Sequence, residues 1–176
     1  MKHHRTTRLI EDVRGAAVIE MALVAPVFAL MVIGIVDMSN AYTTKLGLEQ
    51  GAQRAIEKIM NTTESATVEA TLANEAVCQV NGMNADGTCK TSPITASNVT
   101  VTWRLDCTVG GATTTQSTTS SATYDGWLAS CAGTKAGYVQ VRVDDKYTPL
   151  FPVHFASFTS ADGTYHISAT AGTRTL

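Results

Sequence analysis

Two residues near the start of the chain have types and spacing that could carry chemistry: Gly15, directly before the long apolar run, and Glu20, inside it. A peptidase acting at a membrane surface needs a residue without a side chain beside the bond that it cuts. Gly15 and Ala16 are therefore a candidate cleavage site. A secretory signal instead has its small residues after its apolar core. The order found here indicates cleavage ahead of the helix, on the cytoplasmic side, with the apolar helix retained.

Glu20 is the only ionisable residue between Ala16 and Val36. A charged side chain at the centre of a bilayer costs on the order of 2.5–3.5 kcal/mol, and less near the interface, so such a group normally has a partner. Two interpretations of Glu20 stay open. Its carboxylate pairs with a positive group, or it reaches the interface or hydrogen-bonds within a small membrane bundle.

Four cysteines form the second group of reactive residues: Cys78, Cys89, Cys107 and Cys131. An even number of cysteines in an exported segment is typical of disulfides, and four cysteines allow three pairings. We favour the sequential pairing, because each bridge would then close a short loop and stabilise the fold by roughly 2–4 kcal/mol. The alternative is free buried thiols. Zinc is less favoured, because the chain has no C-x-x-C motif and no close cysteine–histidine pair.

We find no motif of a catalytic, cofactor or metal site. The chain contains no G-x-S-x-G elbow, no H-E-x-x-H helix and no phosphate-binding loop. His154 and His166 are interpreted as ordinary histidines. Asp144, Asp145 and Asp162 could hold calcium, but they lack the spaced acidic ligands of a known calcium loop. The sequence thus predicts no enzyme activity, cofactor, metal or small-molecule substrate, and its acidic balance argues against nucleic-acid binding.

The element that must position Gly15 and Glu20 is a helix across a membrane. Residues 16–36 would form a helix of about 31 Å, enough to span the hydrocarbon core of a bilayer. Four basic residues precede Ala16 and only Lys45 follows Val36 closely, so the N-terminus is expected to be cytoplasmic and residues 37–176 outside. Pro26 lies within the span. It either kinks or locally melts the helix, which would allow denser packing with neighbouring chains, or it is a tolerated membrane proline.

The segment RGAAVIEMALVAPVFALMVIGIVDMSNAY, with Gly15 before the cut and Glu20 at the fifth position after it, resembles the type IV prepilins. Its R-G-A-A-x-x-E and A-L-V-x-P patterns are similar to those of TadE-like pseudopilins of the tight-adherence (Tad/Flp) pilus system. The resemblance covers about residues 14–60. It is weaker in VRVDDKYTPLFP and YHISATAGTRTL near the C-terminus, and residues 61–135 carry no family signature.

This resemblance implies a structural minor pilin or pseudopilin that assembles or primes an adhesive pilus. A prepilin peptidase would cut after Gly15, and Glu20 would pair with the Ala16 amine of a neighbouring subunit. The expected partners are the membrane, the peptidase, other pilins and the pilus assembly platform. The expected location is the bacterial inner membrane with a periplasmic head, or an extracellular pilus after assembly. The alternative is an uncleaved bitopic anchor that presents a periplasmic binding module.

Beyond the membrane span the hydrophobic period predicts the elements of the head. Apolar residues on one helical face predict that the first helix continues to about Met60: Ala41, Leu48, Ala52, Ala55 and Ile59. A second helix is expected over about 64–79. Alternation with a period of two predicts strands at 99–106, at 139–144 and at 165–171. Residues 109–123, rich in Gly, Thr and Ser, are expected to form an exposed loop, with Tyr124 and Trp127 as a satellite cluster beneath it.

Taken together, these patterns predict an α+β protein with a pilin-like spine and a small antiparallel sheet. The expected organisation is a cleaved cytoplasmic leader without regular structure (1–15), a transmembrane helix (16–36), an amphipathic continuation (37–60) and a periplasmic or extracellular head (61–176).

Overall fold

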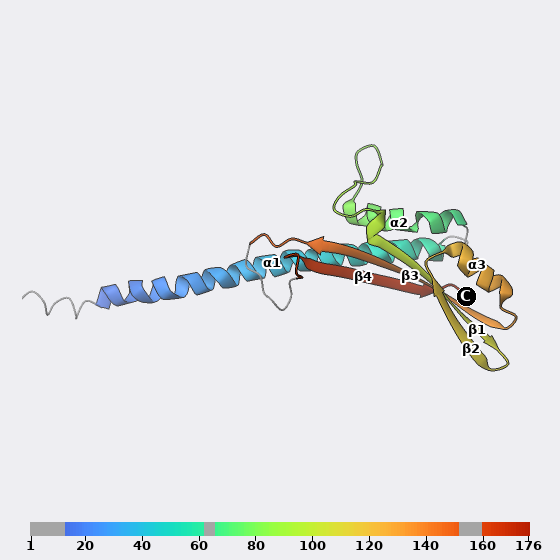
Figure 1. Cartoon of the computed structure of the whole chain (residues 1–176). Coiled ribbons are helices and arrows are strands. Elements are labelled where there is room, and N and C mark those ends of the chain that lie inside the picture. The colour runs from blue at the N-terminus through green and yellow to red at the C-terminus, as the bar shows by residue number, and fades with distance from the viewer. Residues whose placement is uncertain (1–12, 62–65, 152–159) are drawn as a thin grey trace, which may run out of the picture.

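The structure is a computed structural model that describes residues 13–61, 66–151 and 160–176. A long helix, α1 (Val13–Asn61), extends from one end of the molecule, and a head of two further helices and one sheet packs along its C-terminal half (Figure 1). The other elements are α2 (Ala66–Asn81), the short 3-10 helix η2 (Ala96–Asn98), α3 (Ser121–Ser130) and four strands. The predicted α+β class is confirmed.

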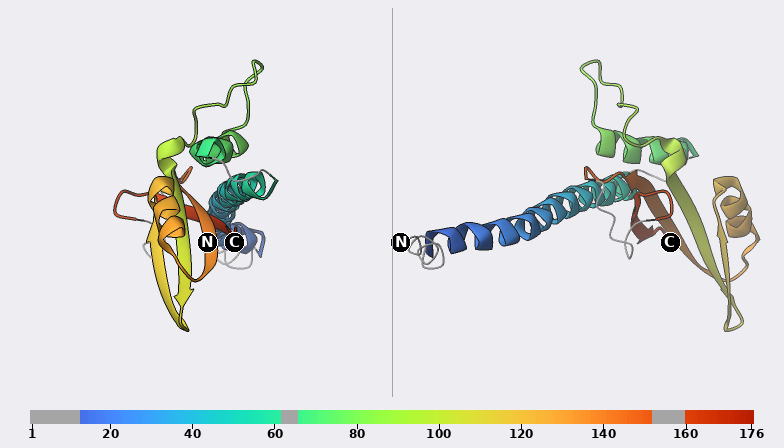
Figure 2. Two further views of the ribbon diagram at one scale, coloured as in Figure 1. Left: turned by 90° about the vertical axis from the view of Figure 1, so that its right-hand side faces the viewer. Right: turned by 60° about the vertical axis from the view of Figure 1, so that its left-hand side comes forward.

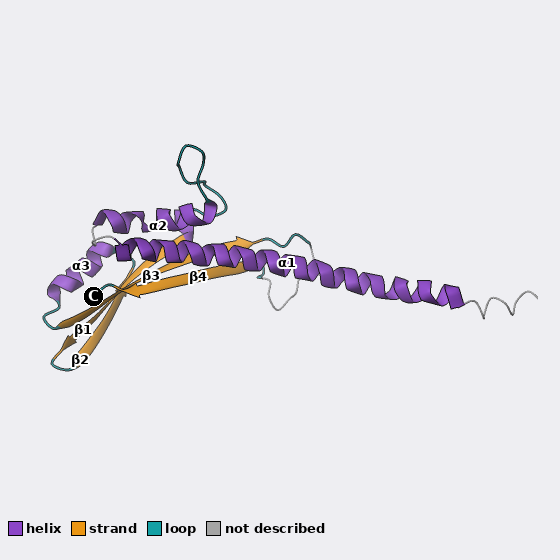
Figure 3. Ribbon diagram, turned by 180° about the vertical axis from the view of Figure 1, so that it is seen from behind, coloured by secondary structure: helices purple, strands orange, loops and turns teal. Residues whose placement is uncertain are grey.

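Helix α1 is 49 residues long, which corresponds to about 73 Å. Its N-terminal half stands clear of the head (Figure 2, right), whereas its C-terminal half runs along strands β3 (Thr134–Tyr147) and β4 (Tyr165–Arg174) of the sheet (Figure 3). The predicted apolar face is confirmed: Leu48, Ala52 and Ala55 are fully buried, Ile59 packs against the core and Ala41 is half-buried. Residues 13–15, expected to lack regular structure, are helical, because no helix-breaking residue separates them from the apolar run. The rest of that expected segment lies outside the described residues.

Helix α2 follows α1 and packs against it. The second predicted helix is confirmed, with a shift of two residues at its C-terminal end; residues 62–65 lie outside the described residues. The buried side chain of Asn81 ends α2 and organises the following loop. Its amide nitrogen donates to Lys90 O and Ile94 O, each at 2.7 Å, and its amide oxygen accepts from Ile94 N at 3.1 Å. These bonds place the Ile94 side chain in the core.

The sheet contains four antiparallel strands in the order β2-β1-β3-β4. They are β1 (Val99–Val109), β2 (Ala112–Thr118), β3 (Thr134–Tyr147) and β4 (Tyr165–Arg174). The three predicted strands are confirmed, because alternate residues of each face the core. Val141 pairs with Val101 on one side and with Ala171 on the other. The opposite face carries exposed polar groups such as Arg104, which lies 4.5 Å over the Tyr138 ring.

The expected exposed loop at 109–123 is wrong in part. Gly110 and Gly111, with φ of 58° and 84°, form a two-residue turn between Val109 and Ala112, and the threonine-rich segment after it pairs with β1 as an edge strand. Two successive residues with positive φ are the signature of a tight hairpin, which glycine adopts without strain. Strand β2 is exposed except at its last residue, Thr118, which is half-buried, so the strand could form without a row of buried apolar residues. Threonine favours extended backbone even where it buries nothing.

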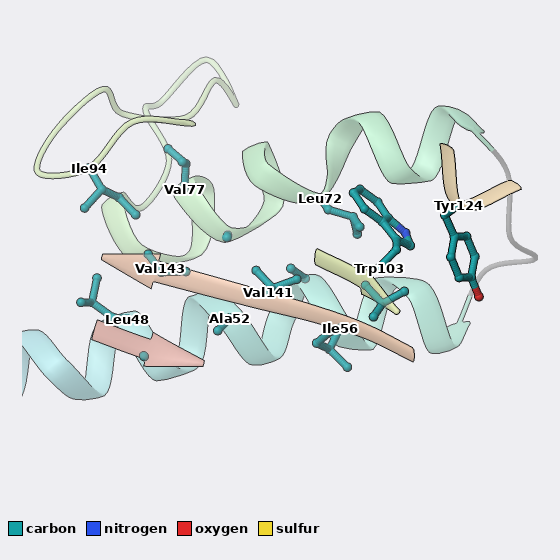
Figure 4. Packing of buried hydrophobic residues seen from close by; sticks show 14 of the residues in the cluster. Leu48, Ala52, Ile56, Leu72, Val77, Ile94, Trp103, Tyr124, Val141 and Val143 are labelled. Atoms are coloured by element: carbon teal, nitrogen blue, oxygen red, sulfur yellow. The ribbon is translucent and has the colours of Figure 1, made fainter. Parts of the chain in front are cut away.

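Side chains from all three helices meet one face of the sheet in a single core (Figure 4). Tyr124 of α3 is fully buried in it and Trp127 packs against it, so the expected satellite cluster is wrong. The reason is that Ser120 caps α3, accepting from Thr123 N at 3.3 Å, and the helix then directs Tyr124 inward. A Cβ at Gly137 of β3 would collide with the Tyr124 hydroxyl, so glycine makes room for the ring.

Two glycines of α1 provide a matched test of the α1–α2 contact. A Cβ at Gly51 would lie 2.5 Å from Val80 Cγ2 and 3.0 Å from Ala76 O, whereas one at Gly47 would meet nothing within 4 Å. We expect Gly51→Ala to lower the free energy of unfolding by about 1–3 kcal/mol through overpacking. Gly47→Ala should instead raise it by roughly 0.5–1 kcal/mol, the usual helix gain. Urea unfolding of the full chain in detergent, followed by circular dichroism, measures both. Equal effects of the two substitutions would contradict close packing at Gly51.

Candidate membrane span and processing site

The N-terminal half of α1 exposes apolar side chains on every side. All residues of 17–32 are exposed, among them Ile19 at 64%, Leu23 at 70% and Phe28 at 65%. A helix that is apolar all round is stable only when lipid or other protein surrounds it. By its length and composition, α1 is the one helix among the described residues that could cross a membrane. None of the 18-residue stretch that meets this test is buried.

Gly15 lies in the first turns of α1, where nothing in the described fold requires a glycine. A Cβ at this position would meet no atom within 4 Å, and Gly15 does not have the positive φ that favours glycine. Glycine within a helix is less stable than alanine by roughly 0.5–1 kcal/mol. The packing of the described residues therefore gives no reason for the small residue next to Ala16.

Glu20 lies on the exposed apolar half of α1, five residues after Gly15. Within the described parts of the chain, no cationic side chain forms an ion pair with it. Its carboxylate is accessible to a group from outside the chain.

Pro26 lies in the same half of α1, and the helix continues through it without interruption. Proline has no backbone N–H, so the carbonyl four residues earlier loses its usual donor. The structure thus has no local melting of the helix at Pro26. The assembly role expected for this residue stays a prediction.

Asp37, the first charged residue after the apolar run, joins α1 to the head by hydrogen bonds that the sequence did not predict. Its side chain is only 7% exposed, and its Oδ1 accepts from Leu150 N at 2.8 Å and from the Tyr147 hydroxyl at 3.2 Å. These bonds join the end of the apolar run to the segment after β3, more than a hundred residues later. The available signal was the position of a carboxylate directly at the polar boundary of an apolar helix.

The four cysteines form two disulfides, Cys78–Cys89 and Cys107–Cys131, which is the sequential pairing favoured above. The first bridge spans 11 residues and joins α2 to the loop that Asn81 also holds. The second spans 24 residues and joins β1 to the residue that caps the end of α3. Both lie in the head, and neither involves α1.

The acidic residues considered for calcium have other partners. Asp162 accepts from Lys146 at 2.9 Å and from the Thr164 hydroxyl at 2.7 Å, and it lies 3.1 Å from the His166 ring. These contacts, with Lys146 the strongest, hold the pKa of the Asp162 carboxyl well below its usual range. Asp144 bonds Arg142. Among the described residues no group of three or more His, Cys, Asp or Glu side chains could hold a metal ion. His154 lies outside them.

Comparison with known proteins gives one match. The sequence model of the TadE-like protein family matches residues 15–56. No curated protein and no solved structure matches the chain. The match begins at Gly15, covers the whole exposed apolar half of α1 and ends at Ile56 in the buried face of the same helix. The sheet, α2 and α3 lie beyond it.

The Tyr147–Asp37 contact predicts a loss of stability at alkaline pH. Burial, together with the negative charge of Asp37, raises the pKa of the Tyr147 hydroxyl. A pKa raised by folding means that the native state holds the proton more tightly than the unfolded state. The stability contributed is then present below the unfolded pKa of about 10 and is lost as pH rises through the folded value.

We therefore expect the thermal midpoint of the full chain in detergent to fall more steeply above pH 10 than that of Tyr147→Phe. Tyr42→Phe, which changes an exposed tyrosine of α1, is the control and should follow the unsubstituted chain. Parallel curves for all three proteins would contradict the coupling between Tyr147 and Asp37.

Proposed function

We propose that this chain, which is TadE-like over residues 15–56, is a minor pilin or pseudopilin of the tight-adherence pilus system and acts in assembling or priming the pilus. The TadE-like match suggests a protein associated with the Tad pilus, and the finer assignment is our proposal. One observation carries it. The match begins at a glycine that the described fold does not use, directly before the apolar run of α1, whose side chains are exposed on every side.

In this proposal a prepilin peptidase cuts the Gly15–Ala16 bond at the cytoplasmic face of the inner membrane. The peptidase is the reason for the glycine. A side chain at position 15 would obstruct access to the bond, whereas within α1 itself a side chain would meet open space. Removal of the leader then leaves Ala16 as the first residue, with a free amine at the start of the apolar helix.

Glu20 supplies the complementary charge. Its exposed carboxylate, four residues after Ala16, pairs with the new amine of a neighbouring subunit when the apolar helices associate. Two opposite charges in a low-dielectric setting stabilise each other only if both are present, and removing one partner of such a buried pair costs about 3–5 kcal/mol. The pair therefore favours association of processed subunits over association of precursors, which lack the amine.

The remaining parts of the chain support a structural role. The head folds on the C-terminal half of α1 and leaves the N-terminal half open to lipid or to other pilins. We place the head in the periplasm, where its two disulfides are stable, with the assembly platform and other pilins as partners. After assembly the subunit would reside in an extracellular pilus that mediates adhesion.

Processing is tested at Gly15. Gly15→Arg should leave the precursor at full length in the membrane, because the arginine side chain lies beside the bond to be cut. Thr7→Arg adds the same charge to the leader away from that bond and should still be processed. Mass spectrometry of the purified proteins reports the N-terminus: Ala16 for the natural chain and for Thr7→Arg, Met1 for Gly15→Arg. A natural chain that begins at Met1 in cells with an active peptidase would instead favour the uncleaved anchor.

Assembly is tested at Glu20. We expect Glu20→Ala to insert into the membrane and to be cleaved, but to co-purify poorly with other pilus components, because the Ala16 amine of a neighbour stays unpaired. Met21→Ala, the adjacent exposed position, removes apolar surface without removing charge and should assemble. Surface attachment of the cells should fall with Glu20→Ala alone. If Glu20→Ala co-purifies and supports attachment as well as the natural chain does, the charge pair is contradicted and the chain is better described as a plain membrane anchor.

A further inference from the structure

The segment of the head after β3 lies beside the end of the apolar run of α1. Asp37 follows Val36 directly, and its carboxylate accepts from the backbone nitrogen of Leu150. Leu150 and Phe151 therefore lie beside the boundary between the lipid-compatible and polar parts of the helix. Ile33 and Gly34, one turn earlier, are half-buried, whereas residues 17–32 are exposed.

Apolar and aromatic side chains gather at this boundary. Leu150 is 64% exposed and Phe151 37%, although the segment that carries them is fixed by the Asp37 contact. Tyr147 and Tyr165, which are paired in the β3–β4 ladder, stack with their ring centroids 6.2 Å apart at the same end of the sheet. Tyrosine is enriched where a membrane meets water, because its ring is apolar and its hydroxyl is polar.

Lipid fits this patch better than water does. An exposed leucine next to an exposed phenylalanine is unfavourable in water, because transfer of apolar surface from water into an apolar phase lowers the free energy. The patch lies beside the residue that follows the apolar span of α1, so the bilayer that surrounds the span is the nearest apolar phase. The charged group of Lys146, Asp162 and His166 at the same end of the sheet suits the hydrated headgroup layer.

We propose that Leu150 and Phe151 enter the interfacial layer of the membrane that α1 spans, so that the head rests on the bilayer instead of standing away from it on a stalk. The inference rests on the membrane location given under the proposed function. It adds a second membrane contact, made by the head, which must be broken when the subunit leaves the bilayer.

Tryptophan fluorescence in bilayers tests the contact. Leu150→Trp leaves the bond to Asp37 intact, because that bond uses the backbone nitrogen. The full chain is reconstituted in phosphatidylcholine vesicles whose acyl chains carry bromine, a quencher, either near the headgroup or near the chain end. Two matched positions give the scale: Phe28→Trp inside the apolar span and Val109→Trp, 54% exposed, at the turn of the β1–β2 hairpin. Emission of the natural Trp103 and Trp127 is subtracted with the unsubstituted chain.

The expected result is a loss of Leu150→Trp emission that is larger with shallow than with deep bromine, together with quenching of Phe28→Trp and none of Val109→Trp. Quenching of Phe28→Trp without quenching of Leu150→Trp would overturn the second contact and leave the span intact. If Phe28→Trp is not quenched, α1 does not span the bilayer, and the proposed function is contradicted as well.

Two further outcomes would overturn the inference. Equal quenching at Leu150→Trp and Val109→Trp would mean that the introduced tryptophan, and not its position, seeks the lipid. If the emission of Leu150→Trp is not quenched by bromine but changes with the protein-to-lipid ratio, the patch contacts a second copy of the chain and not lipid.

Discussion

One constraint governs the whole structure: a single helix has to satisfy two different surroundings. The N-terminal half of α1 offers apolar side chains in every direction and suits a lipid or multi-helix environment. The C-terminal half offers one apolar stripe, which α2 and the sheet cover. The same residue types are used differently in the two halves. In the first half nearly every residue is apolar, as a surrounding lipid phase requires. In the second half the apolar residues recur with the helical period of 3.6 and lie on one face, which the head can cover from one side.

The apolar run of the first half ends at Asp37, whose side chain is only 7% exposed. A carboxylate with low exposure needs partners, and here it has a backbone N–H and a tyrosine hydroxyl from the far end of β3. Neither donor is local in sequence, so the contact forms only when the sheet has docked on α1. Asp37 therefore couples the position of the head along the helix to the point at which the apolar run ends.

Elements with one buried face could be predicted from the sequence, because burial imposes a regular spacing of apolar residues. Elements that bury no face lack this spacing and could not be predicted in the same way. Val139, Val141 and Val143 alternate because one face of β3 meets the core, and that strand could be predicted. Strand β2 buries nothing, so composition suggested a loop, although the Gly110-Gly111 pair was a recognisable hairpin signal. Asp37 could not be assigned its role, because its partners are set by tertiary packing. Gly15 and Glu20 were identified by their residue types and their placement at the apolar run, and no contact within the described fold accounts for either residue.

The placement of the disulfides has a mechanical consequence. Both bridges reinforce the head internally, and α1 contains no cysteine, so the helix is held against the sheet by noncovalent packing alone. Strands β3 and β4 run alongside α1 (Figure 1), and β3 and β4 both contact it. A tension applied between the N-terminus of α1 and the sheet would act as shear along this contact, so that many side chains resist together. The polypeptide between α1 and α2 would limit the extension once the helix slides.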